Sequence, residues 1–318
     1  MKPYAFGVDL GGTTVKIGLF ETSGTLLEKW EIPTRTQNHS ENLLPDIAQA
    51  LMNKLAEKRI QVSDVEGIGM GVPGAALEGR YVKPCVNLDH WGGFDVSERL
   101  SGLCGLPVTV LNDANAAALG EMSHGGGRGS KNMVFVTLGT GVGGGVIVDG
   151  KLLTGAHGAG GEIGHIKVNA DETLVCGCGK RGCLEQYASA TGLLRSAREL
   201  LASSGETTAL RRYENLSCKD IFDCAKEGDA VALRLVDGMT RILGMALAAL
   251  SCVCDPEIIV IGGGVARAGD ILLDSVRKHF KDYVFPAAEE TDFALAELGS
   301  DAGIYGGVQM VLAQRSAD

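Results

Sequence analysis

With 318 residues, the chain is about twice the size of an average domain, which predicts two domains. Hydrophobic residues make up 45% of the chain and charged residues 21%, a balance that excludes a disordered protein. The formal net charge of −10 argues against a general nucleic-acid binder, which would carry a basic face.

The first residues and the cysteines bear on where the protein works. MKPYAFGVDL reaches Asp9 after a short apolar stretch and lacks the apolar core and cleavage site of a signal peptide. The longest apolar run, ILGMALAALSCVC at 242–254, is shorter than a membrane span and predicts a buried core helix. Nine cysteines, an odd number, favour free thiols in a reducing compartment. We therefore expect a cytoplasmic protein without a membrane segment.

The first half of the chain predicts a sheet with flanking helices. Alternating apolar residues over 4–31, interrupted by the turns GGTT and TSG, predict a three-stranded antiparallel meander. Asp95 and Glu98 have capping-box spacing at the start of a helix. The other expected strands are 65–72 and 107–111, and the expected helices are 41–59, 95–102 and 112–122.

The pattern of strand, glycine-rich turn, strand and short strand returns over 132–153. This internal repeat predicts two related α/β domains. We place a smaller domain at 1–115, joined by the last helix at about 302–318, and a larger domain at 116–301. The remaining expected elements are helices near 191–202, 217–226, 229–251 and 268–280, and a strand at 257–261.

Two glycine-rich turns, DLGGTT and LGTGVGGG, each lie between two expected strands. They match neither the Walker sequence nor the dinucleotide fingerprint, whose glycines open a helix. One such turn could be a plain β-hairpin, but two at matched positions and a third after EIIVI favour phosphate binding through backbone N–H groups and threonine hydroxyls. Asp9, just before the first turn, is placed to orient a Mg²⁺ ion. The expected phosphate-binding residues are Gly11, Gly12, Thr13, Thr14, Gly139, Thr140, Gly141, Gly262, Gly263 and Gly264.

The segment CGCGKRGCLE concentrates three of the nine cysteines. Cys176, Cys178 and Cys183 form a Cys₃His set with His165, which is typical of a closed, structural zinc site. A redox dithiol or unligated thiols are the alternatives, but Cys-x-Cys is not the spacing of thioredoxin-like enzymes. The sequence therefore predicts a structural zinc ion.

The metal would fix a glycine-rich loop that has too much conformational entropy to hold a side chain still. The fixed loop would present Glu185, which follows the last cysteine. His165, bound to the metal through one ring nitrogen, can offer the other to a substrate hydroxyl, and Glu162 joins the same surface. We expect the zinc to serve substrate binding and to perform no chemistry.

Asn112 and Asp113 stand where an expected strand meets a helix start. Either residue could simply cap the helix. A helix N-terminus also stabilises a carboxylate, so Asp113 should be ionised at neutral pH. An ionised aspartate can orient a hydroxyl and accept its proton during phosphoryl transfer.

Together, DLGGTTVK, LGTGVGGG and IGGGVA resemble the phosphate and adenosine motifs of the actin–hexokinase–heat-shock ATPase superfold. More narrowly, the chain resembles the ROK family (repressors, open reading frames and sugar kinases) from about residue 4 to residue 312, because GEIGH and CxCGxxGCxE are both intact. The ending CLEQYASATGL is most similar to bacterial glucokinases of that family. The resemblance implies an α/β fold of two domains, actin/hexokinase-like (ribonuclease H-like), with a structural zinc loop.

The resemblance also implies roles for single residues. Asp113 would be the catalytic base. Around Asn87 the chain reads NLDHW, one residue longer than the Asn-Leu-x-Trp pattern of related glucokinases, which leaves the edge of the sugar pocket undefined. Lys16 could face the phosphates or simply cap a strand. The implied sugar-binding residues are Gly74, Asn87, Asn112, Asp113, Glu162, His165 and Glu185.

The implied activity is ATP-dependent phosphorylation of a hexose, glucose to glucose 6-phosphate, with Mg²⁺ accompanying ATP. N-acetylglucosamine or N-acetylmannosamine kinase is the alternative, fructokinase fits less well, and polyphosphate could replace ATP. An alternative from a different functional class is a catalytically inactive, sugar-responsive regulator of the same family. Such regulators carry a winged helix–turn–helix first, for which the early position of Asp9 leaves no room. We expect a sugar and ATP as partners, neither nucleic acid nor membrane, and a homodimer or homotetramer as in resembling proteins.

Overall fold

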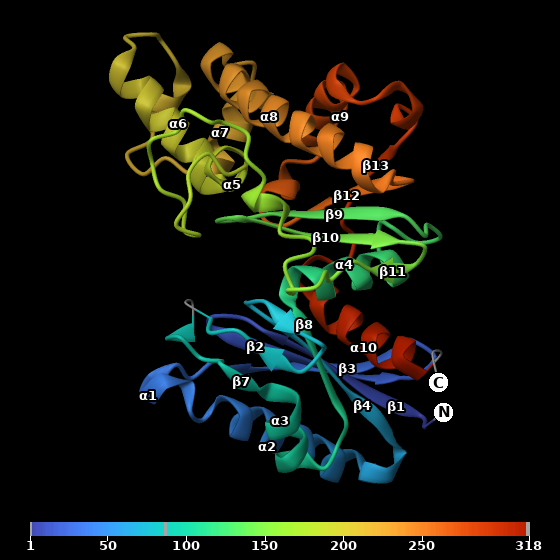
Figure 1. Ribbon diagram of the computed structural model, residues 1–318. Helices are drawn as coiled ribbons and strands as arrows, with labels where there is room; N and C mark the ends of the chain where they lie inside the picture. Colours follow the sequence, from blue (N-terminus) through green and yellow to red (C-terminus); the bar gives the residue numbers. More distant parts are fainter. Residues whose placement is uncertain (1, 86–87, 316–318) are drawn as a thin grey trace. The chain divides into compact units, whose positions relative to one another are not determined.

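The computed structural model describes residues 2–85 and 88–315, and the chain divides into two compact units (Figure 1). The first unit comprises Met1–Gly129, Leu152–Gly160 and Ser300–Asp318. The second comprises Ser130–Lys151 and Gly161–Gly299. The first unit includes the last helix and runs on past residue 115, where the sequence analysis placed the boundary.

A five-stranded mixed sheet forms the centre of the first unit, in the order β3-β2-β1-β4-β8. The first three strands form the expected antiparallel meander, and β4 and β8 add to β1 in parallel. The carboxyl ends of β1, β4 and β8 therefore lie at one edge of the sheet. The strands are β1 (Tyr4–Leu10), β2 (Thr14–Glu21), β3 (Leu26–Pro33), β4 (Val65–Val72) and β8 (Val108–Asn112).

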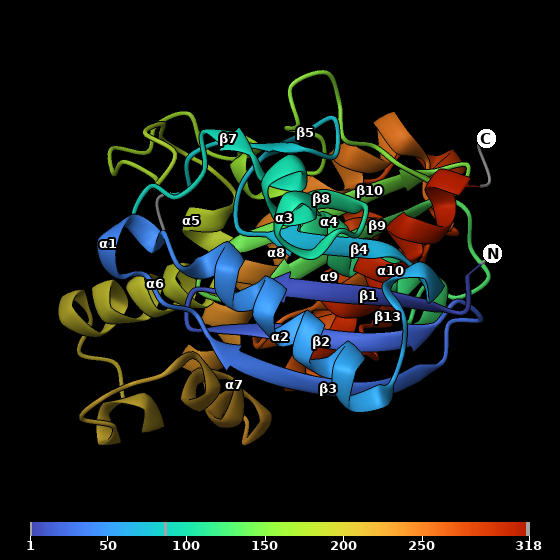
Figure 2. The same ribbon diagram turned by 90° about the horizontal axis from the view of Figure 1, so that it is seen from below.

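Helices cover both faces of this sheet. The leucine-rich face of α2 is buried on one side, and Figure 2 shows α2 lying across β1, β2 and β3. On the other side α10 buries Ile304 and Val308 against Ala5 and Phe20, and it packs along α4. The helices are α1 (Gln37–Ser40), α2 (Leu43–Lys58), α3 (Val96–Cys104), α4 (Asp113–His124) and α10 (Ala302–Arg315).

Glycines allow α10 to lie directly on the backbone of its neighbours. A Cβ on Gly69 of β4 would lie 1.8 Å from the carbonyl oxygen of Gly307, and one on Gly120 of α4 would lie 2.2 Å from that of Ala302. Neither β4 nor α4 could carry a larger residue at these positions. This packing keeps α4 in the first unit and explains why the unit extends to Gly129.

A second, small sheet in the first unit has the order β5-β6-β7. Its strands have two residues each, so they left no periodic signal in the sequence. They are β5 (Ala76–Leu77), β6 (Tyr81–Val82) and β7 (Phe94–Asp95).

The sheet of the second unit has the order β11-β10-β9-β12-β13, which repeats the strand order of the first unit. As in the first unit, the strand pair around the glycine turn is antiparallel and the next two pairs are parallel. The internal repeat predicted from the sequence is thus present in three dimensions. The strands are β9 (Met133–Leu138), β10 (Val142–Val148), β11 (Lys151–Leu152), β12 (Ile258–Gly262) and β13 (Asp292–Leu295).

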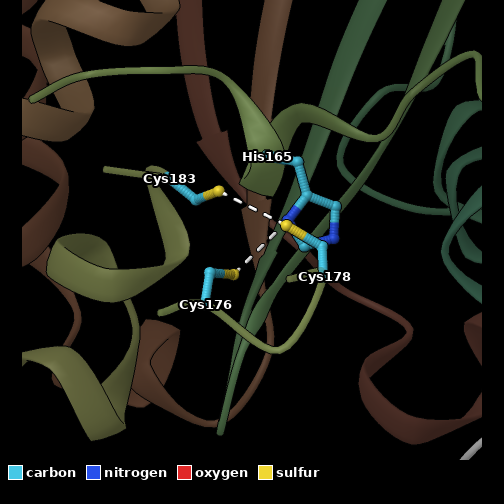
Figure 3. A group of neighbouring side chains, drawn as sticks. All are labelled: His165, Cys176, Cys178 and Cys183. Atoms are coloured by element: carbon cyan, nitrogen blue, oxygen red, sulfur yellow. Dashed lines mark hydrogen bonds between the residues drawn. The ribbon is translucent and has the colours of Figure 1, made fainter. Parts of the chain in front are cut away.

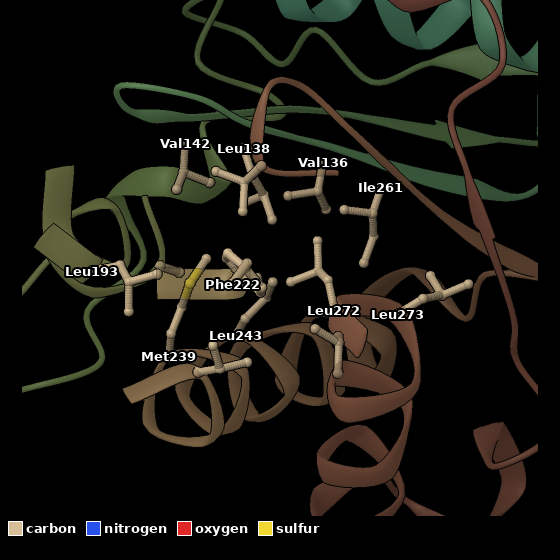
Figure 4. Close-up of a cluster of buried hydrophobic side chains, with 14 of the residues drawn as sticks. Val136, Leu138, Val142, Leu193, Phe222, Met239, Leu243, Ile261, Leu272 and Leu273 are labelled. Carbon is tan, nitrogen blue, oxygen red and sulfur yellow. The ribbon is translucent and has the colours of Figure 1, made fainter. Parts of the chain in front are cut away.

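Helices pack on one face of this second sheet (Figure 1). Their apolar side chains, among them Phe222, Leu243 and Leu272, meet Val136 and Ile261 of the sheet in a continuous core (Figure 4). The helices are α5 (Glu185–Ala188), α6 (Ala190–Ser203), α7 (Cys218–Lys226), α8 (Ala230–Cys254) and α9 (Asp270–Tyr283).

Helix α8 is longer than its apolar run suggested. Among the described helices it alone has the length and composition to cross a membrane, yet 50% of its most apolar window is buried inside the protein. Buried residues such as Met239 and Leu243 belong to the core of the second unit. This agrees with the core helix expected from the sequence.

Candidate functional site

Two carboxylates lie at the carboxyl edge of the first sheet. Asp9 is near the end of β1, and Asp113 directly follows β8. Gly71 of β4 lies between them, since a Cβ there would be 3.5 Å from Asp113 Cα and 3.6 Å from Asp9 Oδ1. Burial and the neighbouring Asp113 carboxylate raise the pKa of Asp9 to about 6. A closely spaced acidic pair of this kind favours a nearby cation.

At the start of α4, the adjacent residues Asn112 and Asp113 have different roles. Asn112 Oδ1 accepts the N–H groups of Ala114 at 3.0 Å and Asn115 at 3.2 Å, so Asn112 caps the helix. Asp113 is the first helical residue, and its Oδ1 accepts the N–H of Ala114 at 2.8 Å. The positive end of the helix therefore stabilises the Asp113 carboxylate. Because capping falls to Asn112, a cap role does not account for Asp113.

Gly74 lies beside this helix start. The side-chain amide of Asn112 donates to the Gly74 carbonyl at 3.4 Å. A Cβ on Gly74 would lie 2.6 Å from the Cys85 sulfur, which explains the glycine. Gly74, Asn112 and Asp113 are thus neighbours. Asn87 lies outside the described residues.

The first glycine turn joins β1 to β2. The N–H of Gly11 donates to the Thr14 carbonyl at 3.0 Å, and the Thr34 hydroxyl donates to the Gly11 carbonyl at 2.7 Å. Lys16 Nζ donates to the Ser300 carbonyl at 2.8 Å. Lys16 therefore ties β2 to the segment that precedes α10, a contact that sequence analysis did not foresee.

The start of α10 presses on Asp9. A Cβ on Gly303 would lie 2.6 Å from Asp9 Cγ and 2.9 Å from its Oδ2. Only a glycine leaves room for the carboxylate in this position. Sequence analysis missed Gly303, although the small residues of DAGIYGG near the end of the chain signal a close helix crossing.

In the second unit, the four predicted metal ligands lie together (Figure 3). One ligand atom from each of His165, Cys176, Cys178 and Cys183 lies within 4.8 Å of all the others. The sulfurs of Cys178 and Cys183 are 3.6 Å apart, and the Cys176 sulfur is 3.8 Å from His165 Nδ1. A tetrahedral ion with metal–sulfur bonds of about 2.3 Å has edges of about 3.8 Å, so the cluster fits such an ion.

The other ring nitrogen of His165 points to Glu162. Its Nε2 is 3.9 Å from Glu162 Oε2, and both side chains are partly exposed. With Nδ1 facing the cluster, Nε2 is available to a ligand next to Glu162. The 3₁₀ turn Ile163–His165 positions both residues.

Contacts besides the cluster also hold the metal loop, which is the loop that carries Cys176, Cys178 and Cys183. Lys167 Nζ lies 3.2 Å from the Cys183 sulfur and donates to the Arg181 carbonyl. The Tyr187 hydroxyl donates to Glu172 at 2.5 Å, which is the main cause of lowering the pKa of Glu172 to about 2. The spacing of the cysteines predicts the metal ligands but carries no information on these polar partners.

The second and third glycine turns are neighbours in the second unit. Gly263 has φ of +86°, and a Cβ there would lie 2.4 Å from the Leu138 carbonyl oxygen at the end of β9. β9 and β12 are parallel, with Gly262 opposite Thr137, so the two turns leave the same edge of the sheet. Glu185 also reaches this edge, because its Oε2 accepts the N–H of Val142 at 3.1 Å.

A family model described as the ROK family matches residues 5–314. A glucokinase of Halalkalibacterium halodurans is 44% identical over 316 residues, which are 98% of this chain and 96% of that protein. The ROK hexokinase of Thermus thermophilus superposes with a TM-score of 0.82 at 31% identity, covering 99% of this chain and 100% of that one. The ROK family glucokinase of Streptomyces griseus, solved with glucose and AMPPNP, gives a TM-score of 0.75 at 34% identity over 96% and 98% of the two chains. These likenesses confirm the fold class expected from the sequence.

Proposed function

This chain belongs to the ROK family of sugar kinases and regulators, and from this membership we propose that it is an ATP-dependent glucokinase. The reaction transfers the terminal phosphoryl group of ATP to the 6-hydroxyl of glucose. The observation that carries the proposal is the similarity, over nearly the whole chain, to curated glucokinases. Asp113, the glycine turns, Asp9 and the Cys₃His cluster each have a proposed role in this reaction.

Asp113 is the proposed general base. Its carboxylate stands at the amino-terminal end of α4, where the helix dipole favours a negative charge. An ionised aspartate orients the sugar hydroxyl and accepts its proton as the bond to phosphorus forms. Gly74 and Asn112, which contact each other, are the proposed sugar-binding neighbours of this base in the first unit.

The glycine turns are the proposed phosphate-binding elements. The N–H groups of Gly11 and Gly139 close their turns by donating to the Thr14 and Gly141 carbonyls. Other N–H groups of the turns, such as those of Gly12 and Thr140, and the threonine hydroxyls are the proposed donors to phosphate oxygens. Asp9 is the proposed partner of the Mg²⁺ that accompanies ATP, directly or through water. Its raised pKa reflects a buried carboxylate that a cation would stabilise.

We assign zinc to the Cys₃His cluster, because three thiolates and an imidazole are a typical ligand set for structural zinc. When bound, zinc supplies rigidity and leaves no coordination position for substrate. The side chains that the loop then holds in place, Glu162, His165 and Glu185, are proposed to bind sugar hydroxyls. A buried polar group left without its partner costs about 1–3 kcal/mol, so such a set can discriminate between hexoses.

The proposal includes a cytoplasmic enzyme that assembles as a homodimer or homotetramer. ATP is the proposed donor, and nine cysteines outside disulfides suit a reducing compartment.

A coupled assay of ADP release tests the proposal. Glucose, mannose, fructose, N-acetylglucosamine and N-acetylmannosamine are offered with ATP or polyphosphate, and we expect glucose with ATP to give the highest kcat/KM. Asp113→Asn should still bind glucose but lose at least about 10²-fold in turnover. A higher kcat/KM with an N-acetylhexosamine than with glucose would show that the N-acetylhexosamine is the substrate. Sugar binding without turnover in the wild-type protein would indicate a regulator instead.

A further inference from the structure

The carboxylate of Glu185 touches the second glycine turn directly. Its Oε2 accepts the N–H of Val142 at 3.1 Å, and a Cβ on Gly141 would lie only 2.2 Å from the same oxygen. Gly141 therefore leaves the space that this carboxylate fills. The turn and the side chain fit together so closely that neither can shift alone.

The same carboxylate also touches the metal cluster. Its other oxygen, Oε1, lies 3.7 Å from the Cys176 sulfur. Cys183, a second cluster residue, precedes Glu185 by two positions, and its N–H donates to the side chain of Gln186 at 3.0 Å. Leu184 between them is fully buried, so the backbone at Glu185 follows the position of the cluster.

A backbone hydrogen bond also holds the turn from this side. The N–H of Ala190 donates to the Gly139 carbonyl at 2.9 Å, just after α5. A cavity of about 260 Å³ lies between the second glycine turn and the metal loop. It is lined by Thr140 of the turn and by Cys176 and Glu185. Beside the cluster ligand His165, a Cβ on Gly164 would lie 2.0 Å from the Val142 carbonyl oxygen, so the backbone next to His165 also contacts the second glycine turn. Glu185 adds a side chain that contacts both the cluster and the turn.

We propose that Glu185 couples the metal cluster to the second glycine turn, so that metal binding raises the affinity of the protein for the phosphates of ATP. This inference rests on the proposed function, which makes the turn a phosphate-binding element. A cluster held by its metal fixes Glu185, and the fixed carboxylate holds the turn in one conformation before the nucleotide arrives. Preorganisation of this kind raises affinity by lowering the ordering cost of binding. Glu185 thus positions the turn in addition to any contact with sugar.

The test measures binding of Mg²⁺–AMPPNP by calorimetry in the absence of sugar. The wild-type protein loaded with zinc should bind it about 10-fold more tightly than the metal-depleted protein, within the usual range of coupling between two sites. Zinc-loaded Glu185→Ala should lose the same factor, and its affinity should no longer depend on the metal. Glu227→Ala, which removes an exposed carboxylate from the same unit, is the matched control and should bind as the wild type does.

A second measurement reads the coupling in the opposite direction and starts from the zinc-loaded protein. Coupling between two binding sites is reciprocal, so AMPPNP should raise the zinc affinity of the wild-type protein by the same factor in competition with a chromophoric chelator. Gly141→Ala, which crowds Glu185 from the side of the turn, should lower zinc affinity. Nucleotide affinity that is equal with and without zinc, and equal in Glu185→Ala, overturns the coupling. Failure of the zinc-loaded wild type to bind any nucleotide overturns the proposed function and the coupling with it.

Discussion

Replacing Gly303 by alanine would test whether the start of α10 sets the position of Asp9. The new Cβ would lie 2.6 Å from Asp9 Cγ, whereas non-bonded carbon atoms prefer about 3.5 Å, so one of the two must move by about 1 Å. Retreat of the helix from the sheet would open its close packing on Gly69 and Gly120, which makes that movement costly. The displacement therefore falls mainly on Asp9.

The expected effect is larger on catalysis than on stability. A displacement of about 1 Å in a positioning group can cost about 10²-fold in rate, so kcat/KM for Mg²⁺–ATP should fall by about that factor. Crowding typically costs about 1–3 kcal/mol, and the better helix propensity of alanine returns up to about 1 kcal/mol. The free energy of unfolding should therefore fall by about 0–3 kcal/mol.

Steady-state kinetics with varied ATP and urea unfolding at pH 7 measure both quantities. Gly102→Ala is the matched control, because Gly102 lies in α3 of the same unit and a Cβ there meets nothing within 4 Å. The control should gain up to about 1 kcal/mol in stability without a change in kinetics. Wild-type kinetics in Gly303→Ala would refute the idea that α10 positions Asp9.

Three further predictions concern single side chains. Lys167→Met removes the ammonium group next to the Cys183 sulfur, so the protein should release zinc to a chelator more readily, whereas Lys167→Arg should retain most of the affinity; equal affinities would contradict this role. Burial and the Asp113 carboxylate raise the pKa of Asp9 from 3.8 to about 6, so ionised Asp9 destabilises the folded state at pH 7 by up to about 3 kcal/mol and this penalty disappears as the pH falls to 4. Asp9→Asn should thus be more stable than the wild type in urea at pH 7 but not at pH 4, and a less stable variant at pH 7 would argue against the raised pKa. Leu243→Ala in the fully buried core of the second unit should lower the free energy of unfolding by about 2–5 kcal/mol and leave KM for glucose unchanged; a loss below 1 kcal/mol would indicate a looser core.

Much of the fold and part of the site follow from short-range patterns. The meander over β1, β2 and β3 could be predicted because alternation and turn residues are local signals. The metal cluster could be predicted because three of its members are close in sequence and soft thiolates prefer metal ions. Asn112 and Asp113 were marked by the change from strand to helix.

Contacts between distant segments could not be predicted in this way. The approach of Gly303 to Asp9 depends on α10 returning to the first sheet, and no pattern near Asp9 carries that information. The hydrogen bond from Val142 to Glu185 likewise depends on how closely the second glycine turn packs against the start of α5. The extension of the first unit past residue 115 has the same origin, since the packing of α4 on α10 decides it.

The late position of α10 in the chain has a consequence for biosynthesis. Ile304, Val308 and Val311 cover Ala5 and Phe20, residues that leave the ribosome near the very beginning of translation. Their face of the first sheet therefore stays open to solvent until the final helix emerges, whereas the second unit has all its strands by Leu295. Nascent or prematurely terminated chains should accordingly be recognised by chaperones through the amino-terminal half, and a carboxyl-terminal deletion should be cleared by proteases even though it spares the metal loop.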